Sequence, residues 1–109
     1  MQKLDEQRIE TIIRFIDGVE KDLENTSLED FNKSDLLVRA TCFSLVQIGE
    51  HMNRLEKKIG TEYPNLPWSE AIKLRNLVVH VYNQVKSEII YEVAKIDLPK
   101  LKANFLKII

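Results

Sequence analysis

The chain has few of the residues that mark secreted, membrane-bound or metal-binding proteins. Its 109 residues include one cysteine, three glycines and three prolines. A single cysteine permits no internal disulfide, which is typical of proteins kept in a reducing compartment. The sequence has no run of about 18 apolar residues, which a transmembrane helix would need. Residues 1–6 lack the apolar segment of a signal peptide. We therefore expect a cytoplasmic protein that makes no contact with a membrane.

The chain also lacks an excess of positive charge. Lys and Arg number 16 and Asp and Glu number 17, which gives a formal net charge of −1. Proteins that coat or store nucleic acid are usually basic, so any contact with nucleic acid must come from a local patch. There is no glycine-rich phosphate loop and no Cys/His cluster with the spacing of metal ligands. We expect no metal site and no cofactor.

Helical periodicity begins near the N-terminus. Apolar residues recur at steps of three and four over residues 4–24, which predicts an amphipathic helix. Ser27 is expected to begin a short helical turn. Either Asn32 or Ser34 should then cap a second, longer helix from about residue 35 to residue 59.

Glycine and proline predict where the remaining helices begin and end. Gly60 should stop the second helix as its C′ residue, and Pro67 fits the first turn of a third helix. Ser87 can cap a fourth helix. The Asp-Leu-Pro sequence at residues 97–99 should break or kink the chain before a last amphipathic segment. At this length we expect one domain, residues 1–109, folded as an all-α, up-and-down bundle of about four to five helices.

The second helix is apolar on almost all sides, which is more than one small bundle can bury. A second copy of the chain would cover the remainder, so we expect a homodimer. Gly49, in the middle of this helix, costs about 1 kcal/mol relative to alanine, which favours the close approach of another helix there. Arg39 and Glu50 interrupt the apolar surface. They either form a buried ion pair or face a cleft.

The end of the second helix is basic, with Arg54, Lys57 and Lys58 close together. Such residues are ordinary partners for the negative end of a helix dipole, which is the simpler explanation. They also suit a track for a nucleic acid backbone. His51, about one turn earlier, is most simply a surface residue.

The stretch from Arg75 to Tyr82 places four chemically capable side chains among aliphatic residues. At about 100° per residue, Tyr82 lies about 20° round the helix from Arg75, Asn76 about 100° and His80 about 140°. The aliphatic residues fill the opposite side, which should face the core. The angle between Arg75 and His80 is too wide for a tight pair on one straight helix, which hints at a cleft shared by two copies. Lys73 adds positive charge near that cleft.

These side chains match the requirements of metal-free RNA cleavage. An arginine fork can hold two phosphate oxygens without losing its charge, and a histidine can act as acid or base near neutral pH. Arg75 would bind the phosphate, His80 would transfer protons, and Asn76 would orient His80 or the phosphate. The simpler alternative is a surface arginine and a hydrogen-bonded histidine without any chemistry.

The wider pattern resembles the HepT-like toxins of the HEPN (higher eukaryotes and prokaryotes nucleotide-binding) superfamily, whose signature is Arg, four residues, His, one residue, Tyr. The matching segments are Tyr63-Pro64-Asn65-Leu66-Pro67-Trp68, Arg75-Asn76, His80-x-Tyr82 and Asp97-Leu98-Pro99, and Ile48-Gly49-Glu50 looks like another segment of the family. The resemblance covers about residues 5–101. It implies a dimeric helical bundle and a metal-independent endoribonuclease with Arg75 and His80 in the dimer cleft. The expected product is a 2′,3′-cyclic phosphate end.

The resemblance also implies a partner and a form of control. The partner would be a minimal nucleotidyltransferase antitoxin, in a toxin–antitoxin pair of type II or type VII. It would use ATP and silence the toxin by transferring AMP to Tyr82. From their charge and position alone, and not from the resemblance, Lys73, Arg54 and Lys57 are candidates for further contacts to the RNA. The alternative is a non-catalytic HEPN subunit of a nucleotidyltransferase complex that binds nucleotides or proteins. The net negative charge favours that alternative, and the complete Arg, His and Tyr set is against it.

Overall fold

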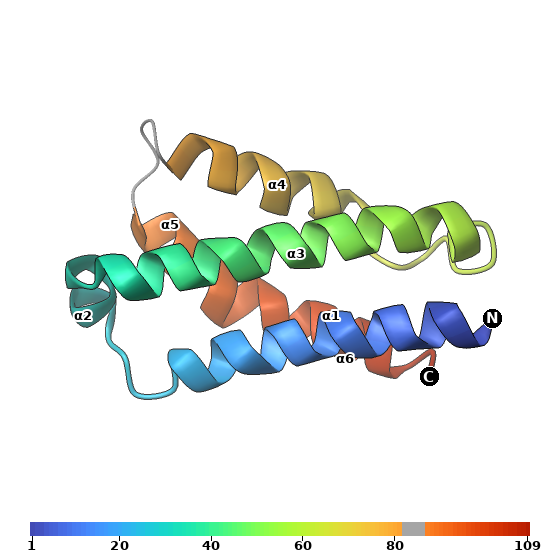
Figure 1. Ribbon diagram of the computed structural model, residues 1–109, viewed down its shortest axis with the longest axis horizontal. Helices are drawn as coiled ribbons and strands as arrows, with labels where there is room; N and C mark the ends of the chain where they lie inside the picture. Colours follow the sequence, from blue (N-terminus) through green and yellow to red (C-terminus); the bar gives the residue numbers. More distant parts are fainter. Residues whose placement is uncertain (82–86) are drawn as a thin grey trace.

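The computed structural model describes residues 1–81 and 87–109, with the backbone alone for His80 and Val81. The described part contains helices and no strand, which confirms the all-α prediction (Figure 1). The elements are α1 (Lys3–Asp22), α2 (Leu28–Lys33), α3 (Asp35–Ile59), α4 (Ser69–Val81), α5 (Ser87–Glu92), the π-helical turn η1 (Val93–Asp97) and α6 (Leu98–Leu106). Because α5, η1 and α6 follow one another without a gap, they form one continuous helical segment. None of the described helices is long and apolar enough to cross a bilayer.

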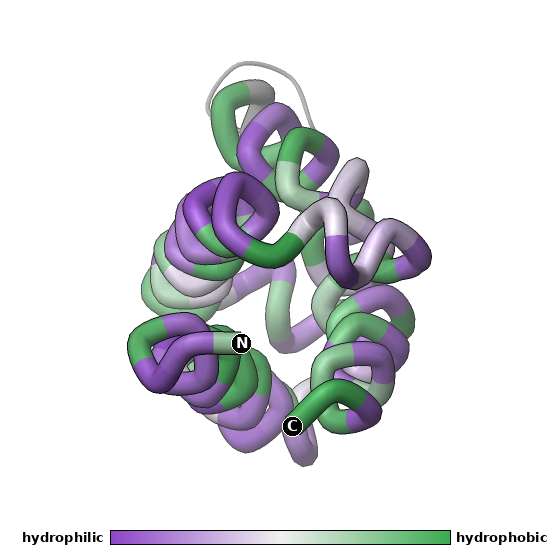
Figure 2. Tube along the Cα trace, turned by 90° about the vertical axis from the view of Figure 1, so that its right-hand side faces the viewer, coloured by the Kyte–Doolittle hydropathy of each residue, from purple (hydrophilic) through white to green (hydrophobic). Residues whose placement is uncertain are grey.

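The long helices lie side by side along an elongated molecule of 42 × 27 × 19 Å. α3 packs against α1 on one side and α4 on the other, and it runs antiparallel to both. α6 packs against α1, and its Phe105 ring contacts that of Trp68, just before α4, with 6.2 Å between ring centroids. Figure 2 looks along the long axis and shows the helices around a common centre, with both termini at the same end of the bundle. This up-and-down arrangement is the one that the sequence predicts.

The core comes from the apolar stripes that the sequence periodicity predicts. One face of α1 and one face of α3 supply most of it, and α4, η1 and α6 close it from the other side. Its fully buried members include Ile9, Ile12, Ile16, Leu45, Ile48, Met52, Leu55, Leu74, Leu98 and Phe105. Fully burying an aliphatic or aromatic side chain contributes about 1.5–3 kcal/mol, so these stripes fix which face of each helix is left for solvent or a partner.

Two serine N-caps set where helices α2 and α3 begin. The Ser27 hydroxyl accepts a hydrogen bond from the backbone N–H of Asp30 at 3.1 Å, and α2 begins there. The Ser34 hydroxyl accepts from the N–H of Leu37 at 3.1 Å, so Ser34 and not Asn32 caps α3. Each cap contributes about 1 kcal/mol, and the predicted bounds of α3 are confirmed.

Three predicted helix ends are wrong in detail. Gly60 is the C-cap residue of α3 with φ −58°, so it does not use the left-handed conformation expected of a C′ glycine. Its lack of a side chain matters for space, because a Cβ would lie 2.5 Å from the carbonyl oxygen of Glu56. Pro67 precedes α4, which begins at Ser69. Ser87 is the first residue of α5, and its hydroxyl donates to the side-chain oxygen of Asn32.

The chain stays helical through residues 97–99, where the sequence predicts a break or a kink. Pro99 has no N–H to donate to the carbonyl four residues earlier. The helix widens into the π turn η1 just before it, and the N–H of Leu98 reaches back to the carbonyl of Val93. A π turn inserts one extra residue and re-aims the helix. The helix therefore adapts to Pro99 and does not end there.

Candidate functional site

Gly49 sets how closely α4 approaches α3. A Cβ at this position would lie 3.0 Å from the carbonyl oxygen of Ala71 and 3.0 Å from Cγ of Arg75. Both contacts are tighter than a Cβ normally makes, so the helices reach this distance because residue 49 has no side chain. The prediction that Gly49 admits a neighbouring helix is confirmed, and that helix is the one that carries Arg75.

The guanidinium of Arg75 lies beside Glu50 of α3, with 3.1 Å between Nε and Oε1. The two side chains are 45% and 40% exposed, so the ion pair is at the surface. Arg39 pairs with Asp35, one turn away on the same helix, with 2.8 Å between Nε and Oδ2. A buried pair of Arg39 with Glu50 is therefore wrong. Glu50 instead pairs with Arg75 at the surface, and the alternative that it faces a cleft stays a prediction.

This arrangement leaves Arg75 suited to binding an anion. A guanidinium carries five N–H donors in a planar fork, and the contact with Glu50 at Nε lies along one edge of it. Nearly half of the side chain remains exposed to solvent or to a ligand. Phosphate oxygens take two parallel N–H donors from such a fork. Glu50 restricts the rotation of Arg75 and presents the rest of the fork outward.

The structure describes only some of the other predicted site residues on and after α4. Asn76 is exposed on the helix next to Arg75. His80 belongs to the last turn of α4, but its side chain and the whole of Tyr82 lie outside the described residues. Lys73 is about 200° round the helix from Arg75 and contacts Asp97 at 3.0 Å. The hydrogen bond to Asp97 raises the pKa of Lys73, and the structure does not bring Lys73 together with Arg75.

Exposed apolar side chains lie on both of the helices that form the Arg75–Glu50 pair. On α4 they are Ile72 and Val79, which are 61% and 64% exposed. On α3 they are Leu36 and Phe43, which are 69% and 61% exposed. Leu36, Phe43 and Glu50 follow one another at steps of seven residues, so they lie along one stripe of α3 within about 40°. We call these four side chains the apolar face; sequence analysis predicted surplus apolar residues on α3 but not which ones stay exposed.

The far end of the same side of α3 carries a basic groove. It has a volume of 260 Å³ and is lined by Leu4, Asp5, Arg8, Arg54, Lys57 and Lys58, which come from the start of α1 and the end of α3. Arg54 and Lys57 were predicted as candidates for nucleic acid contact, and the structure brings them together. Sequence analysis missed Arg8, because only the antiparallel packing of α1 on α3 places it there.

His51 is half-buried between the helices, so the prediction of a plain surface residue is wrong. Its ring lies 6.2 Å from the ring of Phe15, and its Nδ1 lies 3.3 Å from Nη1 of Arg8. Burial lowers the pKa of His51 first, and the positive charges of Arg8 and Arg54 lower it further. Because a guanidinium can only donate, Nδ1 of His51 is the acceptor in the contact with Arg8.

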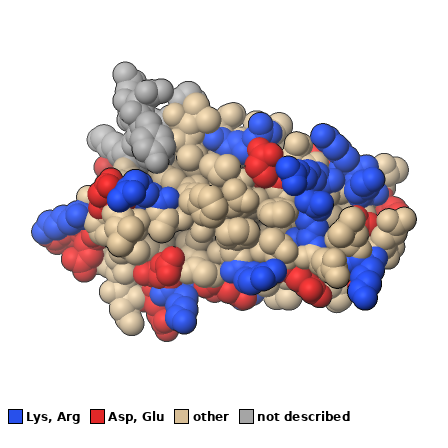
Figure 3. Space-filling model, viewed as in Figure 1, with Lys and Arg blue, Asp and Glu red and all other residues tan. Residues whose placement is uncertain are grey.

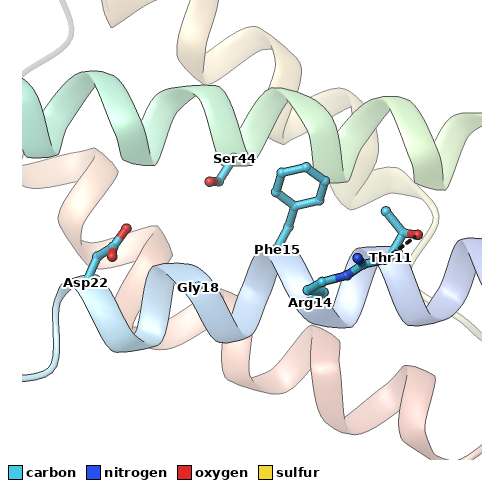
Figure 4. Close-up of a pocket in the computed structure, with 6 residues that line it drawn as sticks. All are labelled: Thr11, Arg14, Phe15, Gly18, Asp22 and Ser44. Carbon is cyan, nitrogen blue, oxygen red and sulfur yellow. Dashed lines mark hydrogen bonds between the residues drawn. The ribbon is translucent and has the colours of Figure 1, made fainter.

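A second hollow lies further along the same side of α1, again between α1 and α3. It has a volume of 440 Å³ and is lined by Thr11, Arg14, Phe15, Gly18, Asp22 and Ser44. In Figure 4 the Phe15 ring projects from α1 toward α3, and Ser44 projects from α3. A Cβ at Gly18 would meet nothing within 4 Å. The Arg14 guanidinium donates to the Thr11 hydroxyl at 3.3 Å. Phe15 also contacts Phe43 with 6.4 Å between ring centroids, so this hollow adjoins the apolar face. Among the described residues, no three His, Cys, Asp or Glu side chains gather as metal ligands would.

The fold and the site define the class of this protein as an all-α bundle that exposes an arginine at the crossing of two helices. Comparison with known families makes the class specific. Residues 6–108 match the family described as Ribonuclease HepT-like. Because the match covers nearly the whole chain, the chain belongs to this family, and the resemblance to the HepT-like proteins of the HEPN superfamily is confirmed.

Curated relatives are similar to the chain over most of its length. A protein of Caldanaerobacter subterraneus named as a putative RNase is 31% identical over 103 residues, covering 94% of this chain and 86% of its own. A protein of Methanocaldococcus jannaschii that bears the same kind of name is 30% identical over 98 residues, covering 90% of this chain and 81% of its own. A protein of Thermococcus cleftensis named as a probable ribonuclease HepT is 26% identical over 112 residues, covering 99% and 98%. No solved structure matches the chain closely enough to compare.

Proposed function

We propose that the chain is a metal-independent endoribonuclease that cuts RNA in a cleft between two copies of itself. The observation that carries the proposal is the exposed guanidinium of Arg75, held along one edge by Glu50, in a chain of the Ribonuclease HepT-like family. The names of the relatives support RNA as the substrate. The exposed position of Asn76 beside Arg75 supports a second polar contact to the phosphate or to His80.

The proposed reaction is an attack of a ribose 2′-OH on the adjacent phosphorus. The 2′-oxygen loses its proton as the new P–O bond forms, and the bond to the 5′-oxygen breaks. His80 transfers protons in this step, since an imidazole can both accept and donate near neutral pH. Arg75 holds two phosphate oxygens while negative charge builds on them. The products are a 2′,3′-cyclic phosphate and a 5′-hydroxyl end, so atoms and protons balance without a metal or a cofactor.

The apolar face supports a homodimer. Leu36, Phe43, Ile72 and Val79 each leave more than half of their surface open on the side that carries Arg75. In Figure 3 an uncharged area covers the middle of this side of the molecule. A second copy that covered it would remove apolar surface from water and enclose both arginines. The interface and the cleft would then be the same place.

The first experiment is cleavage of RNA by purified protein with EDTA present. Arg75→Ala and His80→Ala should each abolish cleavage, and Arg39→Ala is the matched control because Arg39 sits in a similar exposed pair on α3. Surface substitutions usually change stability by less than about 0.5 kcal/mol, so Arg75→Ala should melt like wild type. Full activity in Arg75→Ala or His80→Ala would place the chemistry elsewhere. A wild-type protein that binds RNA or nucleotides but never cuts would support the non-catalytic alternative.

The second part of the proposal is control by AMP transfer to Tyr82 from a nucleotidyltransferase antitoxin encoded beside this chain. Tyr82 comes seven residues after Arg75, about 20° from it if the helix continues. An AMP group there would put a negative phosphate next to Arg75 and compete with RNA. Mass spectrometry after co-expression should find the AMP mass on wild type and not on Tyr82→Phe. An AMP adduct that persists on Tyr82→Phe would remove Tyr82 from this role.

A further inference from the structure

The basic groove gathers four cationic side chains in one place. Arg8, Arg54, Lys57 and Lys58 line it together with a single carboxylate, Asp5. The Asp5 side chain is already used, because it accepts a hydrogen bond from the backbone N–H of Gln2 at 3.2 Å and caps α1. The groove is therefore strongly positive in a chain whose formal net charge is −1.

These four cations stand out because, in the described part of the chain, they line one groove without an ion pair, whereas other cations without one, such as Lys21 and Lys107, lie elsewhere on the surface. Among the described residues, ion pairs join Lys33, Arg39, Lys73, Arg75 and Lys102 to carboxylates, and none involves a residue of the groove. Figure 3 shows Lys and Arg gathered over the end of α3 on the same side of the molecule as the uncharged area. Unpaired cations at close range repel one another, which is tolerated more easily when an anion binds between them.

One of the cations is held in position. Nη1 of Arg8 lies 3.3 Å from Nδ1 of His51, and the His51 ring is backed by Phe15. Arg8 itself is only partly exposed. Fixing a guanidinium before a ligand arrives lowers the entropic cost of binding. This is a feature of a binding groove, whereas lysines that only neutralise a helix dipole need no such support.

The groove continues from the site of Arg75 along α3. Arg54 follows Glu50, the partner of Arg75, by one helical turn, or about 6 Å along the axis. Lys58 follows by another turn. We propose that the basic groove binds the sugar–phosphate backbone of the RNA beside the phosphate held by Arg75. This inference rests on the proposed function for its choice of ligand.

The lining also indicates how the RNA is recognised. Leu4 is the one apolar side chain among the residues that line the groove, and no aromatic ring lines it. Bases are held on aromatic or apolar platforms, and phosphates by cations. The groove should therefore hold RNA without regard to sequence, and binding should weaken steeply with salt.

The test uses the full chain with His80→Ala, so that RNA binds without being cut. Arg54→Gln/Lys58→Gln in this background should weaken binding of a single-stranded RNA oligonucleotide by tenfold or more at low salt. It should also lower the slope of log affinity against log salt by about 1.4, because each phosphate that is no longer neutralised lowers the slope by about 0.7. The control is Lys21→Gln/Lys107→Gln, which removes the same charge from exposed positions elsewhere and should leave both quantities unchanged. An unchanged affinity and slope in the groove variant would overturn the inference.

A second measurement separates this inference from the proposed function. With His80 intact, the groove variant should cut a long RNA with a raised KM and an unchanged kcat, and should cut a dinucleotide as wild type does. Equal cleavage of long RNA by both proteins would refute the groove and leave the ribonuclease standing. Salt-dependent binding that needs the groove, without cleavage by wild type, would refute the ribonuclease and leave the groove standing. The groove variant could also bind RNA normally and fail to form a complex with the nucleotidyltransferase. That result would show that the groove binds the nucleotidyltransferase and not RNA, and it would overturn the inference.

Discussion

The orientation of the Arg75 guanidinium depends on one side chain, the carboxylate of Glu50. The pair is about half exposed, and exposed ion pairs contribute about 0–1 kcal/mol to stability. The ion pair therefore adds little to stability, and we propose that its role is to orient Arg75. The Glu50 carboxylate would also repel a bound phosphate, so this role requires that the gain from orientation exceed that repulsion.

Glu50→Gln should lower kcat on the order of tenfold, which corresponds to about 1.4 kcal/mol of transition-state stabilisation. KM should stay the same or fall, since the repulsion of the phosphate is removed. Asp35→Asn is the matched control, because it breaks the similar exposed pair with Arg39, and it should leave both constants unchanged. Steady-state cleavage and thermal melting measure the two effects. A loss of stability without a fall in kcat would make Glu50 structural.

His51 makes the stability of the chain depend on pH. Burial and the charges of Arg8 and Arg54 lower its pKa in the folded protein, against the opposing charge of Glu50. The unfolded chain then binds a proton at a higher pH than the folded chain does, so stability falls as pH drops below about 6.5 toward the lowered pKa. Wild type should lose more stability than His51→Gln between about pH 7.5 and pH 5.5. Denaturant unfolding at both pH values checks this, and equal losses in the two proteins would contradict it.

Among the elements, the crossing of α3 and α4 depends on one glycine. Replacing Gly49 with alanine would gain about 1 kcal/mol in helix propensity. The added Cβ would, however, lie 3.0 Å from the Ala71 carbonyl oxygen and 3.0 Å from Cγ of Arg75. The carbonyl is backbone of a packed helix and cannot turn away as a side chain would. Forcing an extra methyl into a packed contact typically costs about 1–3 kcal/mol, so the steric cost should win.

Gly49→Ala should therefore lower stability and reduce RNA cleavage, because α4 must move outward and carries Arg75 with it. Gly18→Ala is the matched control, since a Cβ there meets nothing within 4 Å. That variant should gain up to about 1 kcal/mol and keep full activity. Denaturant unfolding and cleavage assays compare the two variants. A Gly49→Ala protein that is stabilised like Gly18→Ala would show that α4 yields freely at the crossing.

The elements themselves could largely be predicted from the sequence, because their signals are local. Ser34 and the apolar period of residues 35–59 locate α3 correctly. The predicted helix ends at Gly60 and Pro99 are wrong because each depends on the space around the residue. At Gly60 that space is limited by the Glu56 carbonyl. At Pro99 the helix makes room by widening into the π turn η1. Residue type indicates that glycine or proline disturbs a helix, but only the packed backbone decides how the chain responds.

The candidate site residues could be named from the sequence, but their contacts could not. The sequence shows an arginine, an amide and a histidine on one helix, which is enough to suggest that the protein binds or cleaves a phosphodiester. The pairing of Arg75 with Glu50 depends on the register between α3 and α4, which Gly49 sets in three dimensions. The place of Arg8 in the groove depends likewise on how α1 lies along α3. Contacts between distant parts of the chain carry no local signal.

At the scale of the whole molecule, the kind of side chain on one side of α3 changes along its length. Its first half carries Leu36 and Phe43, its middle carries Glu50 with Arg75, and its last half carries Arg54 and the basic groove. An apolar half suits a second copy and a basic half suits an anion. The arginine lies where the two halves meet, so a substrate held in the groove would reach it at the edge of a dimer.

The proposed dimer leads to a test by mixing inactive variants. Arg75 and His80 lie about 140° apart on α4, so we expect Arg75 of one copy to work with His80 of the other. Arg75→Ala and His80→Ala homodimers should both be inactive. Unfolding and refolding them together should restore cleavage, because each mixed dimer then contains one intact pair. Adding Phe43→Asp to both variants should abolish the rescue by breaking the apolar face, whereas Leu106→Asp, at a similarly exposed position on α6, should not. Mixed dimers that form, as shown by sedimentation of tagged copies, but never cut RNA would mean that each active site lies within a single chain.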